Sequence, residues 1–164
     1  MTLAAGLLAG TPSLAAAKAK LASGEALDET EIHHLEFIRE EEKLARDVYI
    51  VMAAKWGEQS HMDAMLKLLE YYGIADPAWD DTVGAFTDPY IKGLYDMLTE
   101  WGLKSEADAL LVGAFIEEYD ILDIWKAVKD TDVDHIDKVY TALYEGSYNH
   151  LRGYVYNWER LTGA

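Results

Sequence analysis

The apolar residues of this chain recur at steps of three and four, which is the period of an α-helix that packs along one side. Four long segments have this pattern, at about residues 28–56, 58–73, 105–129 and 134–160. A shorter helical segment at about 91–101 follows a connection at 74–90 that contains two prolines. No segment alternates apolar and polar residues as a strand does. The sequence therefore predicts an all-α bundle of four long helices, with a long connection and a short extra helix between the second and third.

Residues that favour helix ends lie at the borders of these segments. Asp28, with Glu31 three residues later, forms the pattern of a capping box, and Ser105 with Asp108 repeats it. Gly73 suits the position just after a helix. These signals place the folded domain at residues 28–162.

Residues 1–27 differ in composition from the rest of the chain. An apolar run from Leu3 to Leu8, followed by Ala15-Ala16-Ala17, resembles the end of a secretory signal, although no basic residue precedes Lys18. The segment is too short and too interrupted by glycine and proline to span a bilayer. It is either a tail or a signal-like segment, so the protein is expected to be cytoplasmic or exported.

Charge and cysteine content exclude several classes of function. Asp and Glu number 30 against 14 Lys and Arg, which gives a formal net charge of −16. Nucleic acid and anionic membranes are bound mainly through Lys and Arg, so neither is an expected partner. The chain has no Cys, which excludes disulfides, thiolate metal sites and iron–sulfur clusters. Carboxylate, imidazole or water must therefore bind any metal.

One carboxylate interrupts the apolar stripe of the first predicted helix. Glu42 continues the series formed by Leu35, Ile38, Ala45 and Tyr49. An isolated ionised carboxylate in such a position is costly unless it is paired or bound to a metal. Glu42 therefore either pairs with a basic residue or binds a metal ion.

The other long helices also place an acid or an imidazole on their apolar stripes. Glu58 and His61 are one turn apart, the Glu-x-x-His arrangement of carboxylate-bridged di-metal bundles. Glu117 or Glu118 faces inward, and the periodicity favours Glu117. His150 shares the stripe of the last helix. Each residue alone has a structural explanation, as a solvated acid or a core histidine, but their combination indicates a metal site.

The turn between the third and fourth long helices indicates whether Glu117 and His150 lie at the same level along the bundle. Glu117 and His150 lie at nearly equal distances from the turn at 130–134. In an antiparallel hairpin such residues lie at the same level, so these two side chains are expected to meet.

The strings REEEKLARDVY, EQSHMDAM, GAFIEEYDI and NHLRGYV resemble an uncharacterised prokaryotic domain family (domain of unknown function 2202) over about residues 32–157. Glu42-x6-Tyr49 with Glu58-x-x-His61 looks like the ferritin-like superfamily of di-iron carboxylate proteins, rubrerythrins included. The resemblance implies a ferritin-like four-helix bundle with two iron ions, or manganese, that react with O2 or peroxide in ferroxidase or peroxidase chemistry. It implies these metal ligands: Glu42, Glu58, His61, Glu117 or Glu118, and His150. Tyr49 would act beside a ligand, through a hydrogen bond or as a redox group.

Two features depart from that pattern. Ser147 stands where a second Glu-x-x-His would have its Glu, which leaves open positions for water or oxygen species. In addition, only 16 residues separate Glu42 from Glu58, and on a continuous helix they would stand roughly 24 Å apart. Either a loop is missing from the sequence at Gly57, or one kinked helix swaps between the subunits of a homodimer and brings Glu42 of one chain level with Glu58 of the other.

The alternative is a metal-free helical module for interaction or structure. In that case the Glu and His residues are polar groups of the bundle, and the 11 Tyr and 5 Trp serve packing or partner contact. The iron content of the purified protein discriminates between the two. A hydrolase has little support, since the sequence shows no nucleophile with a paired His and no glycine-rich phosphate loop.

Overall fold

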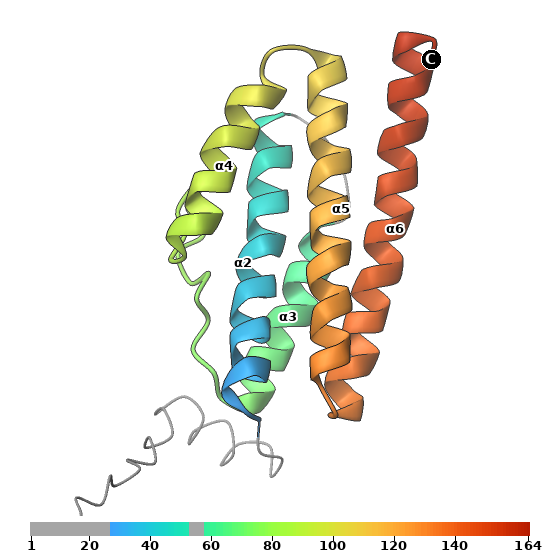
Figure 1. Ribbon diagram of the computed structural model, residues 1–164. Helices are drawn as coiled ribbons and strands as arrows, with labels where there is room; N and C mark the ends of the chain where they lie inside the picture. Colours follow the sequence, from blue (N-terminus) through green and yellow to red (C-terminus); the bar gives the residue numbers. More distant parts are fainter. Residues whose placement is uncertain (1–26, 53–57) are drawn as a thin grey trace, which may run out of the picture.

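The structure is a computed structural model that describes residues 27–52 and 58–164. These residues form five helices and no strand: α2 (Glu29–Val51), α3 (Glu58–Tyr72), α4 (Pro89–Gly102), α5 (Glu106–Asp130) and α6 (Asp134–Thr162). Figure 1 shows α2, α5 and α6 side by side along the length of the molecule, α3 beside their lower part and α4 against their upper part. The all-α prediction is confirmed for the described residues, and the predicted N-terminal tail lies almost wholly outside them.

The predicted caps form as expected. The Asp28 carboxylate accepts from the Glu31 backbone N–H at 2.8 Å, and the Glu31 carboxylate accepts from Asp28 N–H at 3.0 Å. Ser105 Oγ accepts from Asp108 N–H at 3.0 Å at the start of α5. Gly73 follows α3 with a φ of 68°, a left-handed conformation that favours glycine.

The short extra helix begins two residues earlier than predicted. The Asp88 side chain accepts from two backbone N–H groups of the first turn of α4, and Pro89 occupies that turn. Proline suits the first turn because its missing N–H would have no partner inside the helix. The connection between α3 and α4 therefore ends at Asp88.

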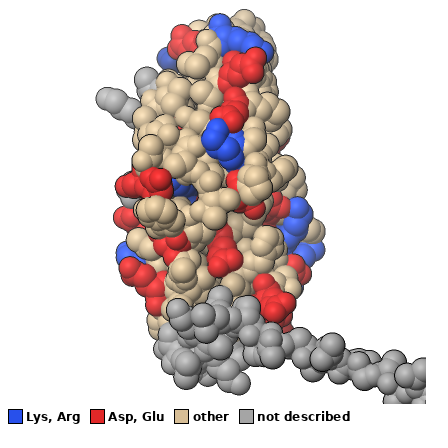
Figure 2. Space-filling view, turned by 90° about the vertical axis from the view of Figure 1, so that its left-hand side faces the viewer, with Lys and Arg blue, Asp and Glu red and all other residues tan. Residues whose placement is uncertain are grey.

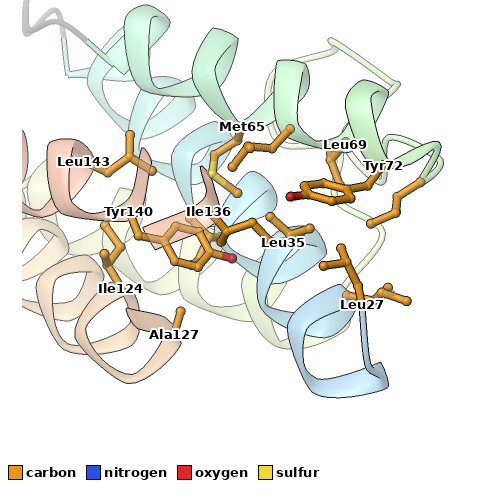
Figure 3. Packing of buried hydrophobic residues seen from close by; sticks show 14 residues of the cluster. Leu27, Leu35, Met65, Leu69, Tyr72, Ile124, Ala127, Ile136, Tyr140 and Leu143 are labelled. Carbon is orange, nitrogen blue, oxygen red and sulfur yellow. The ribbon is translucent and has the colours of Figure 1, made fainter. Parts of the chain in front are cut away.

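Two apolar clusters form the core. The lower cluster joins α2, α3, α5 and α6, and Figure 3 shows Leu35, Met65, Tyr72, Ile124 and Tyr140 pointing toward one another within it. The upper cluster joins α2, α4, α5 and α6, with Val48, Ile91, Leu98, Val112 and Tyr154 among its members. On each of α2, α5 and α6 a short stretch of polar residues separates the residues of the two clusters.

The α2 helix is buried on more sides than an amphipathic helix would be. It packs against α3, α4 and α5, and its buried residues include Glu40, Glu41, Lys43 and Asp47 in addition to the predicted Glu42. The prediction of a single inward carboxylate on this helix is therefore incomplete. A one-sided periodic pattern cannot represent a helix that three neighbours enclose.

The first two helices pack against each other within one chain. The predicted helix continues to about Trp56, but α2 ends at Val51, so this boundary is wrong. Arg39 Nη1 donates to the Met62 carbonyl at 3.1 Å, which fixes α3 antiparallel to α2. The six residues between Val51 and Glu58 span at most roughly 20 Å when fully extended, which limits how far the start of α3 can lie from the end of α2.

This register changes the interpretation of the short spacing. One turn beyond Arg39 on α2 lies Glu42, and one turn before Met62 on α3 lies Glu58. Glu42 and Glu58 therefore each lie one turn from a residue of this contact within a single chain. The packing of α3 against α2 is a third way to bring the two helices together, and the missing loop and the swapped homodimer stay predictions.

Acidic side chains spread over the outer surface. Figure 2 shows them from the bottom to the top of one face, with smaller groups of Lys and Arg between them. Among the described residues, no helix has the length and apolar character needed to cross a membrane.

Candidate metal centre

A layer of polar side chains lies between the two apolar clusters, and we call it the polar layer. It consists of residues 39–43 of α2, Glu117 and Asp120 of α5, and Ser147 and His150 of α6. All of these residues are buried except His150, which is partly buried. Buried polar groups need hydrogen bonds or counter-charges, so the partners of each residue show what it does.

Three residues of the α2 stretch hold the chain between α3 and α4. Arg39 binds the Asp76 carboxylate through Nε and Nη2, both at 3.0 Å. The Glu40 carboxylate accepts from the backbone N–H groups of residues 87 and 88, at 2.5 and 2.7 Å. Lys43 Nζ donates to Asp47 at 2.7 Å and to the carbonyls of residues 82 and 85, at 2.9 and 2.8 Å. Their burial has a structural explanation.

Glu41 and Glu42 instead line a small cavity in the polar layer. Glu117, Asp120 and His150 line the same cavity, and α4 contributes apolar side chains to its wall. The cavity measures about 10 Å³, which is space for roughly one water molecule. Four carboxyl groups therefore face one small space, and no Lys or Arg is among the described residues that line it.

Glu41 is the most unusual of these acids. The residue is 4% exposed, and its carboxylate accepts from no N–H or hydroxyl donor among the described residues. Burial raises the pKa of Glu41 well above its ordinary value, and the nearby charges of Asp120, Asp123 and Glu42 and a hydrogen bond with the Asp123 carboxyl group raise the pKa further. Without a cation in the cavity, these surroundings disfavour the ionised form of Glu41.

Glu117 connects three helices. Tyr49 on α2 donates its phenol proton to Glu117 Oε1 at 2.8 Å, and His150 Nδ1 on α6 lies 3.5 Å from the same oxygen. The predicted meeting of Glu117 and His150 is observed. Of the two adjacent acids, Glu117 is buried whereas Glu118 is exposed, so the structure favours the residue that the periodicity favoured.

Burial also affects Tyr49. It raises the pKa of Tyr49 well above the usual value, and the charge of Glu117 together with the neighbouring Tyr154 raises the pKa further. Both effects favour the protonated phenol, which donates to Glu117.

Asp120 is a site residue that the sequence reasoning missed. It lies one turn after Glu117 on α5, is 7% exposed, and its Oδ2 accepts a hydrogen bond of 2.5 Å from Ser147 Oγ. Glu41 was missed as well. The spacing of Asp120 gave a signal, because it follows Glu117 by three residues and so lies on the same face of α5. The apolar stripe read from the sequence continues through Ile121 at this point, and Asp120 was therefore not assigned to the site.

A family model described as "Uncharacterized protein domain (DUF2202)" matches residues 31–163. The chain belongs to this family. It is 47% identical over 139 residues to the uncharacterized protein MJ0754 of Methanocaldococcus jannaschii, a match that covers 79% of this chain and 75% of the relative. It is also similar to the crystal structure of the hypothetical protein MJ0754 from Methanococcus jannaschii, with a TM-score of 0.81 and 44% identity, over 84% of this chain and 85% of that one. The family resemblance of the four sequence strings is thereby confirmed.

The remaining predicted ligands of this family member lie at the start of α3. The backbones of Glu58 and His61 belong to its first turn, but their side chains lie outside the described residues. Among the described side chains, no group of three or more His, Asp or Glu is placed to hold a metal ion together. The roles of Glu42, Glu58, His61, Glu117 and His150 as ligands stay predictions.

The residues that are present fit a metal centre in their chemistry. Carboxylates with imidazole suit iron and manganese. The buried oxygens of Glu41 accept from no N–H or hydroxyl donor within the described part of the chain and lie beside other carboxyl groups, and a bound cation would supply a counter-charge. Apolar side chains of both clusters enclose the polar layer, which strengthens the attraction of its carboxylates for cations.

The other three histidines whose side chains the structure describes lie away from the cavity. His33 and His135 are exposed. His34 is partly buried, and its Nε2 lies 3.1 Å from Asp130 Oδ2. None of the three lines the cavity.

Proposed function

We propose that this protein is a non-haem di-metal carboxylate protein, with iron as the metal and manganese as the alternative, built on a ferritin-like four-helix bundle. The observation that carries the proposal is the cavity of the polar layer, where Glu41, Glu42, Glu117 and Asp120 meet beside His150 and the described lining residues include no Lys or Arg.

The charge of this site supports a bound cation. Several ionised carboxylates in one buried space repel each other, so they either take up protons or bind cations. Two divalent cations would neutralise four carboxylates and would be bound by residues on α2, α5 and α6.

We assign roles from the positions of these residues. Glu42, Glu117 and His150 would bind the metal from three helices, and Glu58 and His61 would bind it from the first turn of α3. Tyr49 orients the Glu117 carboxylate by its hydrogen bond, as residues next to metal ligands commonly do. The apolar clusters above and below exclude water. When bound, the metal would supply the electrons that reduce O2 or peroxide.

The test is the metal content of the protein. We expect metal-free protein that is loaded with Fe(II) without oxygen, then desalted, to retain about two iron ions per chain. Glu58→Ala/His61→Ala should retain none, because both side chains of the α3 pair are lost. Glu118→Gln is the matched control, since it removes an acid next to Glu117 that faces solvent, and it should retain two ions.

Two outcomes would contradict the proposal. One is wild-type protein that retains no more iron than a protein without a metal site, which would favour the metal-free interaction module. The other is a Glu58→Ala/His61→Ala variant that still retains two ions. Because α2 and α3 pack within one chain, we expect the monomer, separated by native mass measurement, to hold the complete centre.

A further inference from the structure

We propose that Asp120 and Glu41 are also ligands of this metal centre, and that Ser147 positions the Asp120 carboxylate. This inference rests on the proposed function and names two ligands beyond those predicted from the sequence. Both residues line the cavity that Glu42, Glu117 and His150 share.

The environment of Glu41 is the observation that points to a ligand. Its residue is 4% exposed, its carboxylate accepts from no N–H or hydroxyl donor among the described residues, and its hydrogen-bond contact there is with another carboxyl group, that of Asp123. Its two neighbours in sequence differ from it in this respect. Glu40 accepts two backbone N–H groups ahead of α4, and Glu42 is already assigned to the centre. A buried carboxylate with no structural task costs stability, and a cation in the cavity would remove that cost.

Asp120 is held in one orientation by α6. Ser147 is fully buried, and its hydroxyl donates to Asp120 Oδ2 at 2.5 Å. This bond uses one oxygen of Asp120 and fixes the carboxylate at the edge of the cavity. Ser147 is one turn before His150 on the same face of α6, so α5 and α6 each bring two polar residues to the polar layer, and of the two on α6 it is His150 that lines the cavity.

The experiment measures iron per chain after anaerobic loading with Fe(II) and desalting. We expect Glu41→Gln and Asp120→Asn each to retain about one ion instead of two. Glu118→Gln is the matched control, because Glu118 lies two residues before Asp120 on α5, is exposed and does not line the cavity. It should retain two ions. Ser147→Ala should still bind two, but about 10-fold more weakly, as expected for a residue that positions a ligand.

An exchange variant tests the position of the carboxylate. Because the Ser147 hydroxyl lies 2.5 Å from Asp120 Oδ2, a glutamate at position 147 would bring a carboxylate to the same edge of the cavity from the other helix. We expect Asp120→Ser/Ser147→Glu to recover two ions. If it stays at the level of Asp120→Asn, the assignment of Asp120 beside Ser147 is wrong.

The thermal midpoint of the metal-free variants separates a ligand from a structural residue. Asp120→Asn keeps an oxygen that accepts from Ser147 and removes one buried charge, so its metal-free midpoint should equal or exceed that of the wild type. The same holds for Glu41→Gln. A lower midpoint or a loss of folding in both variants would indicate a structural role and would overturn the inference.

The outcomes for the two proposals are distinguishable. If Glu41→Gln and Asp120→Asn retain two ions while Glu58→Ala/His61→Ala retains none, the further inference is wrong and the proposed function stands. If the wild type retains no iron, the proposed function is wrong and the inference falls with it.

Discussion

The Tyr49 phenol on α2 donates a hydrogen bond of 2.8 Å to Glu117 Oε1 on α5, in a part of the protein where both residues are 3% exposed. The two residues are 68 positions apart in the sequence. This bond links the helix that carries Glu41 and Glu42 to the helix that carries Glu117 and Asp120, so it contributes both to stability and to the geometry of the candidate centre.

Removal of this bond should destabilise the protein. Tyr49→Phe leaves the buried Glu117 carboxylate with one donor fewer, and a hydrogen bond to a charged group contributes about 1.5–3 kcal/mol. We expect a loss of that size in the free energy of unfolding of the metal-free protein, measured by urea denaturation. Tyr148→Phe, at an exposed position of α6, should change it little. Equal values for the two variants would show that the bond does not contribute.

A close approach between helices should make one glycine intolerant of substitution. A Cβ at Gly113 would lie 2.3 Å from Cε1 of Tyr154, whose ring centroid is 5.5 Å from that of Tyr49. A Cβ at Gly93 would meet nothing within 4 Å. Both glycines lie inside helices, so the replacement of glycine by alanine raises the helix propensity by the same amount at each position.

The difference between the two alanine variants therefore isolates the clash. We expect Gly93→Ala to stabilise the protein by about 1 kcal/mol, and Gly113→Ala to be about 1–3 kcal/mol less stable than Gly93→Ala, as for other overpacked cores. Urea denaturation of the two variants checks this. A Gly113→Ala variant as stable as Gly93→Ala would contradict the observed packing of Tyr154.

The buried Lys43 should be essential to the connection before α4. Its amine reaches Asp47 and two backbone carbonyls, and the side chain is fully buried. Lys43→Met leaves the buried Asp47 with fewer partners, and a broken buried ion pair costs about 3–5 kcal/mol. Lys92→Met, which breaks an exposed pair with Asp96, should cost less than about 1 kcal/mol. Thermal denaturation of both variants gives the comparison, and similar midpoints would contradict the expectation.

The cap of α5 should make stability depend on pH in the acid range. Hydrogen bonds from Ser105 and Trp101 lower the pKa of Asp108 below its ordinary value of 3.8. The folded state therefore binds this proton less readily than the unfolded state. The stabilisation is present above pH 3.8 and is lost as the pH falls through the lower folded value.

Ser105→Ala tests this cap. At pH 7 it should lower the free energy of unfolding by about 1 kcal/mol, the usual cost of losing an N-cap. The difference from the wild type should shrink as the pH falls below 3.8 and Asp108 becomes protonated, because the carboxyl group then loses its charged interaction with the hydroxyl. Thr141→Ala, at an exposed position within α6, should show no loss at either pH. A difference that grows on acidification would contradict the assigned direction.

Local features of the sequence determined the helices and one contact of the candidate centre. Asp28 and Ser105 mark helix starts because their side chains bond backbone groups only three residues away. Glu117 and His150 could be predicted to meet, since a short turn joins their helices and equal distances from it give equal height. These features depend on residues that are close in sequence, and therefore appear in the sequence itself.

Contacts between distant segments decided the rest. Only the packing of α2 among α3, α4 and α5 buries Glu41 beside Glu42, and only the approach of α6 gives Asp120 its bond to Ser147. Likewise, only the packing of α3 against α2 places Arg39 beside the Met62 carbonyl. Periodicity assigns one face to a helix, whereas burial is the sum over all the neighbours that enclose it, and those neighbours exist only in the folded protein.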